Sequence, residues 1–176
     1  MTASAAKKRF RVVLTVFIVG LVVSGITAFP LLAEMRLLAK WLGVGDAVSP
    51  VGHSGLEFWI LTVRSGLEDM YARYPWIAYG TDWLAFGHIA IALFFVDPLI
   101  RPSESRSALY AGIAACILLV PLALVCGAIR GIPFYWRLID CSFGVLGVIP
   151  LIYCVGLLPH LGSEQLNKAP LTLGKS

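Results

Sequence analysis

Residues 82–101, DWLAFGHIAIALFFVDPLIR, are the stretch from which the organisation of this chain can be worked out. Between Asp82 and Arg101 the run is apolar except for His88 and Asp97. As a helix it is long enough to cross a hydrocarbon core of roughly 30 Å. Ionisable side chains are costly inside a membrane, so His88 is a candidate functional residue. The stretch therefore predicts a membrane helix with a polar site on it.

Composition and length extend this prediction to the whole chain. The 176 residues are 59% hydrophobic and 14% charged, whereas soluble domains carry about 25% charged residues. We expect an all-α membrane protein with a single domain over residues 1–162 and a mobile tail over residues 163–176. The four predicted transmembrane helices cover residues 12–33, 83–100, 108–129 and 141–159. The first run follows KKRFR, as a signal peptide would, but it continues through Leu32, which favours a retained helix.

Basic residues predict the orientation. The net charge of +4 does not indicate nucleic-acid binding, because the basic side chains cluster at the ends of apolar runs. With both termini in the cytoplasm, the cytoplasmic segments would hold Lys7, Lys8, Arg9, Arg11, Arg101, Arg106, Lys168 and Lys175. The outer segments hold fewer basic residues, and those are diluted by acids. We therefore predict an N-in, C-in protein of a bacterial-type cytoplasmic membrane.

The long outer loop is predicted to contain an amphipathic helix over residues 55–74, lying along the membrane interface. One face carries Leu56, Trp59, Ile60, Val63, Leu67, Met70, Tyr71 and Tyr74. Ser54 and Glu57 match a capping box at its start. Arg64 with Glu68 and Asp69 with Arg73 have the spacing of ion pairs on a solvated face.

Small residues predict which helix faces meet. Gly20 and Ser24 in the first run are spaced for close approach to a neighbour. Ala85 and Ala92 share the face of His88, so His88 should point into the helical bundle. The same reasoning applies to Arg130, on a face with Gly127, and to Asp140, on a face with Gly144, Gly147 and Leu151.

These polar residues lead to a binding-site hypothesis. We expect His88, Arg130, Arg137 and Asp140 to meet near the outer boundary under the amphipathic helix. Arg130 and Arg137 would contact an anionic lipid headgroup or a quinone-like molecule, His88 would donate or accept a hydrogen bond, and Asp140 would orient an arginine. Trp59 and Trp136 would form the walls of the entrance. A purely structural interpretation also fits, in which His88 bonds a neighbouring helix and Arg130 pairs with Asp140.

Two other classes of function are compatible with the sequence. A haem or metal oxidoreductase could use His53, Glu57 and His88, although no diagnostic ligand motif is present. A structural or accessory subunit would place the amphipathic helix against a membrane-protein partner or a second copy. Cys126 and Cys141 fall near the same end of adjacent helices, so either a disulfide or two buried thiols would fit. No catalytic motif singles out an enzyme.

Overall fold

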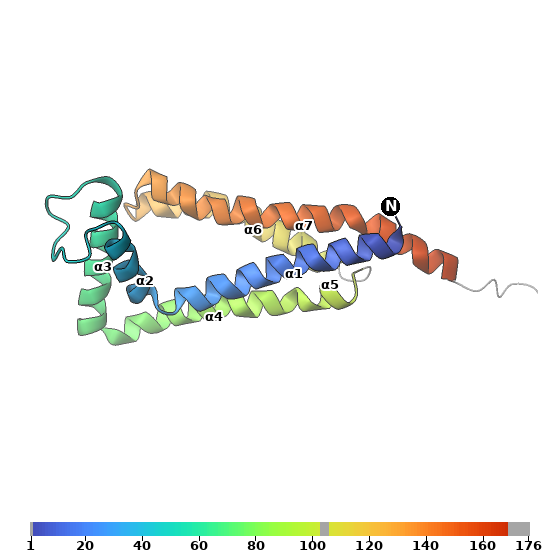
Figure 1. Ribbon diagram of the computed structural model, residues 1–176, viewed down its shortest axis with the longest axis horizontal. Helices are drawn as coiled ribbons and strands as arrows, with labels where there is room; N and C mark the ends of the chain where they lie inside the picture. The colour runs from blue at the N-terminus through green and yellow to red at the C-terminus, as the bar shows by residue number, and fades with distance from the viewer. Residues whose placement is uncertain (1, 103–105, 169–176) are drawn as a thin grey trace, which may run out of the picture. The chain divides into compact units, whose positions relative to one another are not determined.

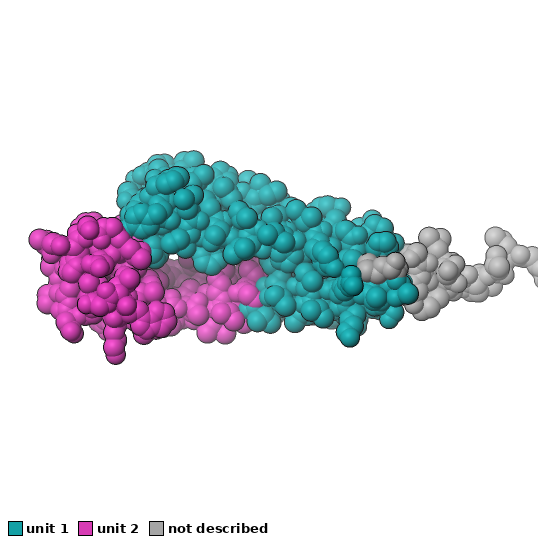
Figure 2. All heavy atoms as spheres, turned by 45° about the horizontal axis from the view of Figure 1, so that its top comes forward, with its two compact units in different colours: residues 1–19, 92–176 teal, residues 20–91 magenta. Residues whose placement is uncertain are grey.

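The computed structural model describes residues 2–102 and 106–168, and the side chains of the second segment as far as residue 161. All regular structure in these ranges is helical. The chain forms two compact units, shown in different colours in Figure 2. Unit 1 combines Met1–Val19 with Ala92–Ser176, and unit 2 is Gly20–Ile91. Two of the long helices thus contribute to both units.

Four long helical segments of the described chain are apolar enough to cross a membrane, as predicted. They are α1 (Ala3–Ala28), the continuous segment Pro75–Ile100, α6 (Arg106–Ile129) and α7 (Phe134–Lys168), of which Phe134–Leu161 is the apolar part. The second segment consists of the short 3-10 helix η1 (Pro75–Ile77), α4 (Ala78–Phe94) and α5 (Val96–Ile100). All four segments begin earlier than the predicted apolar runs, α6 by two residues and the other three by seven to nine residues.

The predicted amphipathic helix is present as α3 (Gly55–Arg73). A second helix, α2 (Leu31–Trp41), was not predicted. We had assigned its first residues to the first transmembrane run, but α1 ends at Ala28, before Pro30. Helix α7 runs through Lys168, so the first residues of the predicted tail are helical. The rest of that tail, residues 169–176, lies outside the described residues.

Within unit 1, α6 and α7 pack as antiparallel neighbours along most of their length (Figure 1). A Cβ added at Gly144 would lie 2.5 Å from the carbonyl oxygen of Cys116, so the two backbones nearly touch. Gly147 sits against the Cys116 sulfur, and Gly112 against Phe95 and Leu151. The predicted small-residue face of α7 is therefore a packing face. All four cysteines are free thiols, which excludes the Cys126–Cys141 disulfide in this structure.

Within unit 2, the end of α1 packs on α4 through Gly25. A Cβ at this position would lie 2.8 Å from the Ala85 carbonyl oxygen and 3.2 Å from the His88 Cβ. We had predicted a close approach at Gly20 and Ser24, but nothing lies within 4 Å of a Cβ built on Gly20. The face of α4 that carries Ala85 and His88 does turn toward a neighbour, as expected.

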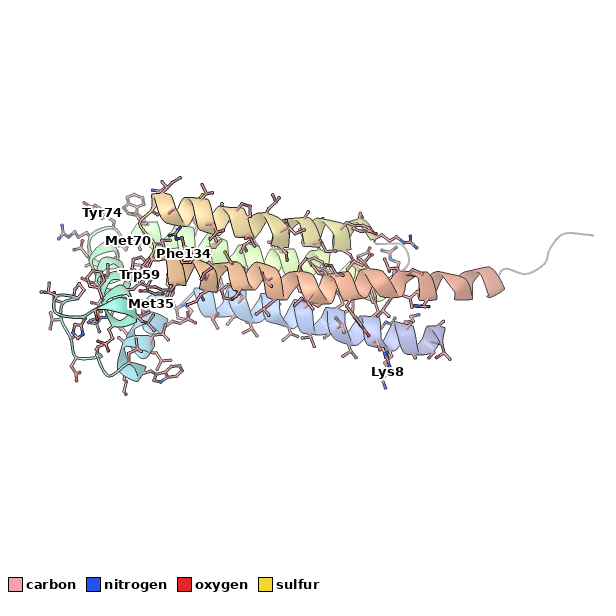
Figure 3. All side chains as sticks on the ribbon, turned by 90° about the horizontal axis from the view of Figure 1, so that it is seen from above. Lys8, Met35, Trp59, Met70, Tyr74 and Phe134 are labelled. Atoms are coloured by element: carbon pink, nitrogen blue, oxygen red, sulfur yellow. The ribbon has the colours of Figure 1, made fainter. Side chains whose placement is uncertain are left out.

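A second contact in unit 2 joins α2 and α3. Met35 and Ala39 of α2 are buried, as are Ile60 and Leu61 of α3. Figure 3 labels Met35 together with Trp59 and Met70 in the region where the two helices meet. Leu61 is not among the residues of the predicted apolar face, yet it is only 1% exposed. The buried side of α3 is therefore rotated relative to the predicted one.

This rotation changes the partners of the charged residues on α3. Arg64, predicted to be solvated and paired with Glu68, is buried, and Glu68 instead binds Arg36 at 3.0 Å. The predicted capping box is also wrong. Ser54 occupies the N-cap position without a side-chain cap bond, and the Glu57 carboxylate lies 3.0 Å from the Nδ1 of His53 instead of reaching back to the N-cap. The predicted pair of Arg73 with Asp69 is confirmed at 2.7 Å, and Arg101 pairs with Asp97 at 2.6 Å.

Candidate functional site

Four of the six predicted ligand residues lie in the turn between α6 and α7 or in the first turns of α7: Arg130, Trp136, Arg137 and Asp140. Gly131 has φ +71°, a left-handed conformation that glycine adopts without strain. Its N–H donates to the Ala128 carbonyl at 3.1 Å, and the Ile132 N–H donates to the Gly127 carbonyl at 2.9 Å. These two bonds form a Schellman motif, which satisfies carbonyls at the end of α6. Pro133 follows directly, and α7 begins at Phe134. The turn therefore reverses the chain within a few residues.

Arg137, in the first turns of α7, reaches back across this turn to α6. Its Nη1 donates to the Leu124 carbonyl oxygen at 3.1 Å. Its Cγ and Cδ fill the space beside Gly127, where an added Cβ would lie only 2.7 and 2.6 Å away from them. The guanidinium carbon also lies 5.3 Å from the centre of the Phe134 ring. Arg137 thus places a positive charge at the negative end of the α6 dipole.

One nitrogen of Arg137 has no hydrogen bond. Its Nε is buried and finds no partner among the described residues. The hydrogen bond that Nη1 donates goes to the Leu124 carbonyl oxygen, which is neutral and does not balance the positive charge of the guanidinium. A partly buried guanidinium with incomplete hydrogen bonding retains the capacity to bind an acidic group.

Arg130 and Asp140 do not behave as expected. Arg130 is exposed, whereas we had predicted that it points into the bundle. Asp140 is partly buried. In the described part of the chain the ion pairs are Arg36–Glu68, His53–Glu57, Arg73–Asp69 and Arg101–Asp97. Neither arginine of the turn therefore pairs with Asp140 among the described residues, and Arg137 donates instead to the Leu124 carbonyl oxygen. The alternative of a simple Arg130–Asp140 salt bridge fails for the same reason.

The remaining predicted ligand residues are distributed over both units. Trp136 lies in the first turn of α7 and is partly buried, and its backbone N–H donates to the Pro133 carbonyl oxygen at 3.0 Å. His88 belongs to unit 2, where its Nδ1 donates to the Leu84 carbonyl oxygen at 2.9 Å, one turn earlier in α4. Trp59 is a partly buried residue of α3. The meeting of His88 and Trp59 with the arginines of the turn stays a prediction.

The proposed metal ligands are only partly brought together. His53 and Glu57 are adjacent at 3.0 Å. Among the residues that the structure describes, no three histidine, cysteine or acidic side chains are grouped so that they could hold a metal ion. A metal centre built on His53, Glu57 and His88 would therefore need a different arrangement of these residues.

Sequence reasoning did not find the buried arginine of unit 2. Arg64 is 8% exposed, and its Nη1 donates to the Gly45 carbonyl oxygen at 3.0 Å while Nη2 donates to that of Ala47. It thereby holds the loop between α2 and α3. Its position four residues after Ile60 and three after Leu61 places it on their helix face, a signal that we had not used.

Comparison with known proteins adds no further constraint. The chain matches no protein-family model, no curated protein and no solved structure. The interpretation of this site therefore depends on its own geometry and chemistry.

Proposed function

We propose that this chain is a multi-pass integral membrane protein that binds an anionic lipid headgroup at the α6–α7 turn through Arg130 and Arg137. It acts by binding, not by catalysis. Both termini lie in the cytoplasm of a cell with a bacterial-type cytoplasmic membrane, so the turn faces the outer leaflet. The basic residues near the ends of the spans support this orientation.

The observation that carries the proposal is the pair of arginines without a carboxylate partner. Arg130 and Arg137 flank the turn, and neither is in an ion pair with any described residue. A turn between two apolar helices long enough to cross a membrane lies at the level of the lipid phosphates. Guanidinium groups bind phosphate through charge-assisted, often bidentate hydrogen bonds. Lipid phosphate is thus the acidic group most available to both side chains.

Charge also favours a headgroup over a quinone-like ligand. A quinone carbonyl is neutral and needs one or two hydrogen-bond donors. The two positive charges of Arg130 and Arg137 at the α6–α7 turn instead suit a ligand with a full negative charge. The exposed side chain of Arg130 is free to meet the phosphate, while Arg137 is held by Leu124 and presents a preorganised charge. In this arrangement Trp136 lies at headgroup depth, where indole rings are common.

The test is native mass spectrometry of the purified protein titrated with phosphatidylglycerol and, separately, with phosphatidylcholine. We expect tighter binding of phosphatidylglycerol than of phosphatidylcholine, and Arg130→Gln should bind phosphatidylglycerol at least about tenfold more weakly than the wild type, since a charge-assisted hydrogen bond contributes about 1.5–3 kcal/mol. Arg130→Lys retains the charge but not the fork of donors. Its affinity for phosphatidylglycerol should therefore lie between those of the wild type and Arg130→Gln.

Arg73→Gln is the matched control, because it removes an exposed arginine that already pairs with Asp69. It should bind phosphatidylglycerol like the wild type. Equal affinity for the two lipids, or an Arg130→Gln variant that binds phosphatidylglycerol as tightly as the wild type, would contradict the proposal.

A further inference from the structure

The helix that the sequence did not predict, α2, begins very close to the end of a membrane-crossing helix. Only Phe29 and Pro30 separate Ala28, the last residue of α1, from Leu31, the first residue of α2. Such a short link gives α2 little freedom to leave the place where α1 emerges from the hydrocarbon. Figure 1 shows α2 turning away from the direction of α1 at this point. The start of α2 must therefore lie at the membrane boundary if α1 crosses the membrane.

The two sides of α2 have different surroundings. Met35 and Ala39 are buried on the side that meets α3. Ala33, Leu37 and Trp41 follow one another at intervals of four residues on another side. Leu37 is 46% exposed and Trp41 is 74% exposed. Unit 2 therefore presents an apolar strip from α2 that none of its own helices covers.

Charged residues border this strip on one side. Lys40 is exposed and lies three residues after Leu37, so the two side chains are neighbours on the helix surface, and the exposed Arg36 lies one turn before Lys40. Arg36 is bound to Glu68 at 3.0 Å, whereas Lys40 is in no ion pair with a described residue. Leucine and tryptophan beside basic residues are typical of helices that lie in the headgroup region of a membrane. The ammonium group of Lys40 is then available for lipid phosphate.

The end of α2 keeps Trp41 at this depth. Gly43 has φ +77°, its N–H donates to the Lys40 carbonyl at 3.1 Å, and the Val44 N–H donates to the Ala39 carbonyl at 2.9 Å. This Schellman motif ends the helix just after Trp41 and turns the chain away. The apolar strip thus stops with an indole ring, the side chain best suited to the boundary between hydrocarbon and headgroups.

We infer that α2, and not α3, is the interfacial helix of this protein, with Leu37 and Trp41 inserted into the lipid and Lys40 at the phosphate level. The partner is the bilayer surface itself. Helix α3 is a weaker candidate because Ile60 and Leu61, on its apolar side, are already covered and its arginines are engaged by Asp69 and by loop carbonyls. This contact is separate from the headgroup site at the α6–α7 turn and does not depend on it.

The test is tryptophan quenching in phosphatidylcholine vesicles that contain the full-length protein. Wild type and Trp41→Phe are compared with brominated lipid, which quenches from within the bilayer, and with iodide, which quenches from water. We expect the fluorescence lost in Trp41→Phe to be the part that brominated lipid quenches and iodide does not. Trp59→Phe is the control, since Trp59 is a partly buried residue of the covered helix α3. Its missing component should be less sensitive to the brominated lipid.

A second probe protects the test against a local effect of the Trp41→Phe substitution. Leu37→Trp in the Trp41→Phe background places the indole one turn earlier on the same strip, and brominated lipid should quench this indole as well. Quenching of the Trp41 component by iodide would place the strip in water and overturn the inference. Resistance to both quenchers would show that another protein surface covers the strip, and this would overturn it too.

Discussion

The turn between α6 and α7 and the loop between α2 and α3 are built with the same two devices. Each begins where a glycine in the left-handed conformation, Gly131 or Gly43, ends a helix with a Schellman motif. Each is then bridged by an arginine whose guanidinium donates to backbone carbonyl oxygens, Arg137 to Leu124 and Arg64 to Gly45 and Ala47. In neither place does the arginine form an ion pair with a described carboxylate.

The two regions differ in what else holds them. The α6–α7 turn joins helices whose backbones nearly touch at Gly144, so close packing fixes the hairpin and Arg137 adds to it. The α2–α3 loop joins shorter helices, whose buried apolar residues are Met35, Ala39, Ile60 and Leu61. Arg64 is more deeply buried and makes two bonds across this loop. We therefore expect the arginine to contribute more to stability at the α2–α3 loop than at the α6–α7 turn.

The largest effect is expected for Arg64→Met. Methionine retains much of the apolar volume but removes both charged donors, leaving the Gly45 and Ala47 carbonyls without this partner. We expect the loop region to lose about 3 kcal/mol of local stability, with faster proteolysis between residues 43 and 54. Arg73→Met removes an equal charge from an exposed pair and should cost less than about 1 kcal/mol. Equal cleavage rates in the two variants would mean that Arg64 does not anchor the loop.

A somewhat smaller effect is expected for Gly144→Ala, which tests packing in the other region. The added methyl would meet the Cys116 carbonyl oxygen at 2.5 Å, and a backbone atom cannot easily move away. Thermal unfolding in detergent should show a loss of about 1–3 kcal/mol. Gly156→Ala in the same helix is the control, because nothing lies within 4 Å of its Cβ position. It should be neutral or more stable by up to about 1 kcal/mol. If both variants unfold at the same temperature, α6 and α7 are not closely packed at Gly144.

Arg137→Met should have a more modest effect than Arg64→Met. The substitution keeps a flexible side chain beside Gly127 and loses one hydrogen bond to Leu124. We expect a decrease of about 1 kcal/mol in the free energy of unfolding. Arg130→Met, at an exposed position, should change it by less than about 0.5 kcal/mol. A loss for Arg137→Met as large as that for Arg64→Met would remove the distinction between the two regions.

The smallest effect is expected for Glu57→Gln at the start of α3. Glu57 contacts His53 in a partly exposed pair and does not cap the helix. We expect a change of about 0.2–0.5 kcal/mol in the stability of α3, measured by hydrogen exchange of its amides. A loss of more than about 1 kcal/mol would instead support the capping box, since a cap contributes about that much.

Sequence patterns predicted the candidate site only in part. They singled out Arg137 and the turn that contains it, because charged residues are conspicuous beside apolar runs. They did not predict that Arg137 would bind a carbonyl of α6, or that Gly127 would leave the space for its side chain. The pairing of Asp140 with an arginine was wrong, since opposite charges near each other in sequence need not meet in space. The missed helix α2 is short, and a pattern over so few residues is weak.

The amino-acid sequence alone determined the four apolar segments and the amphipathic helix α3. The length of an apolar run is set by the thickness of the membrane, and the spacing of apolar residues in α3 is set by the helical repeat, so both can be read from consecutive residues. Only the tertiary structure decided that Gly25 and not Gly20 meets α4, and that Arg64 is buried under a loop. These choices depend on which surfaces of distant segments fit together. A helix has several small residues and several charged ones, and close packing selects among them only when the neighbouring segment is in place.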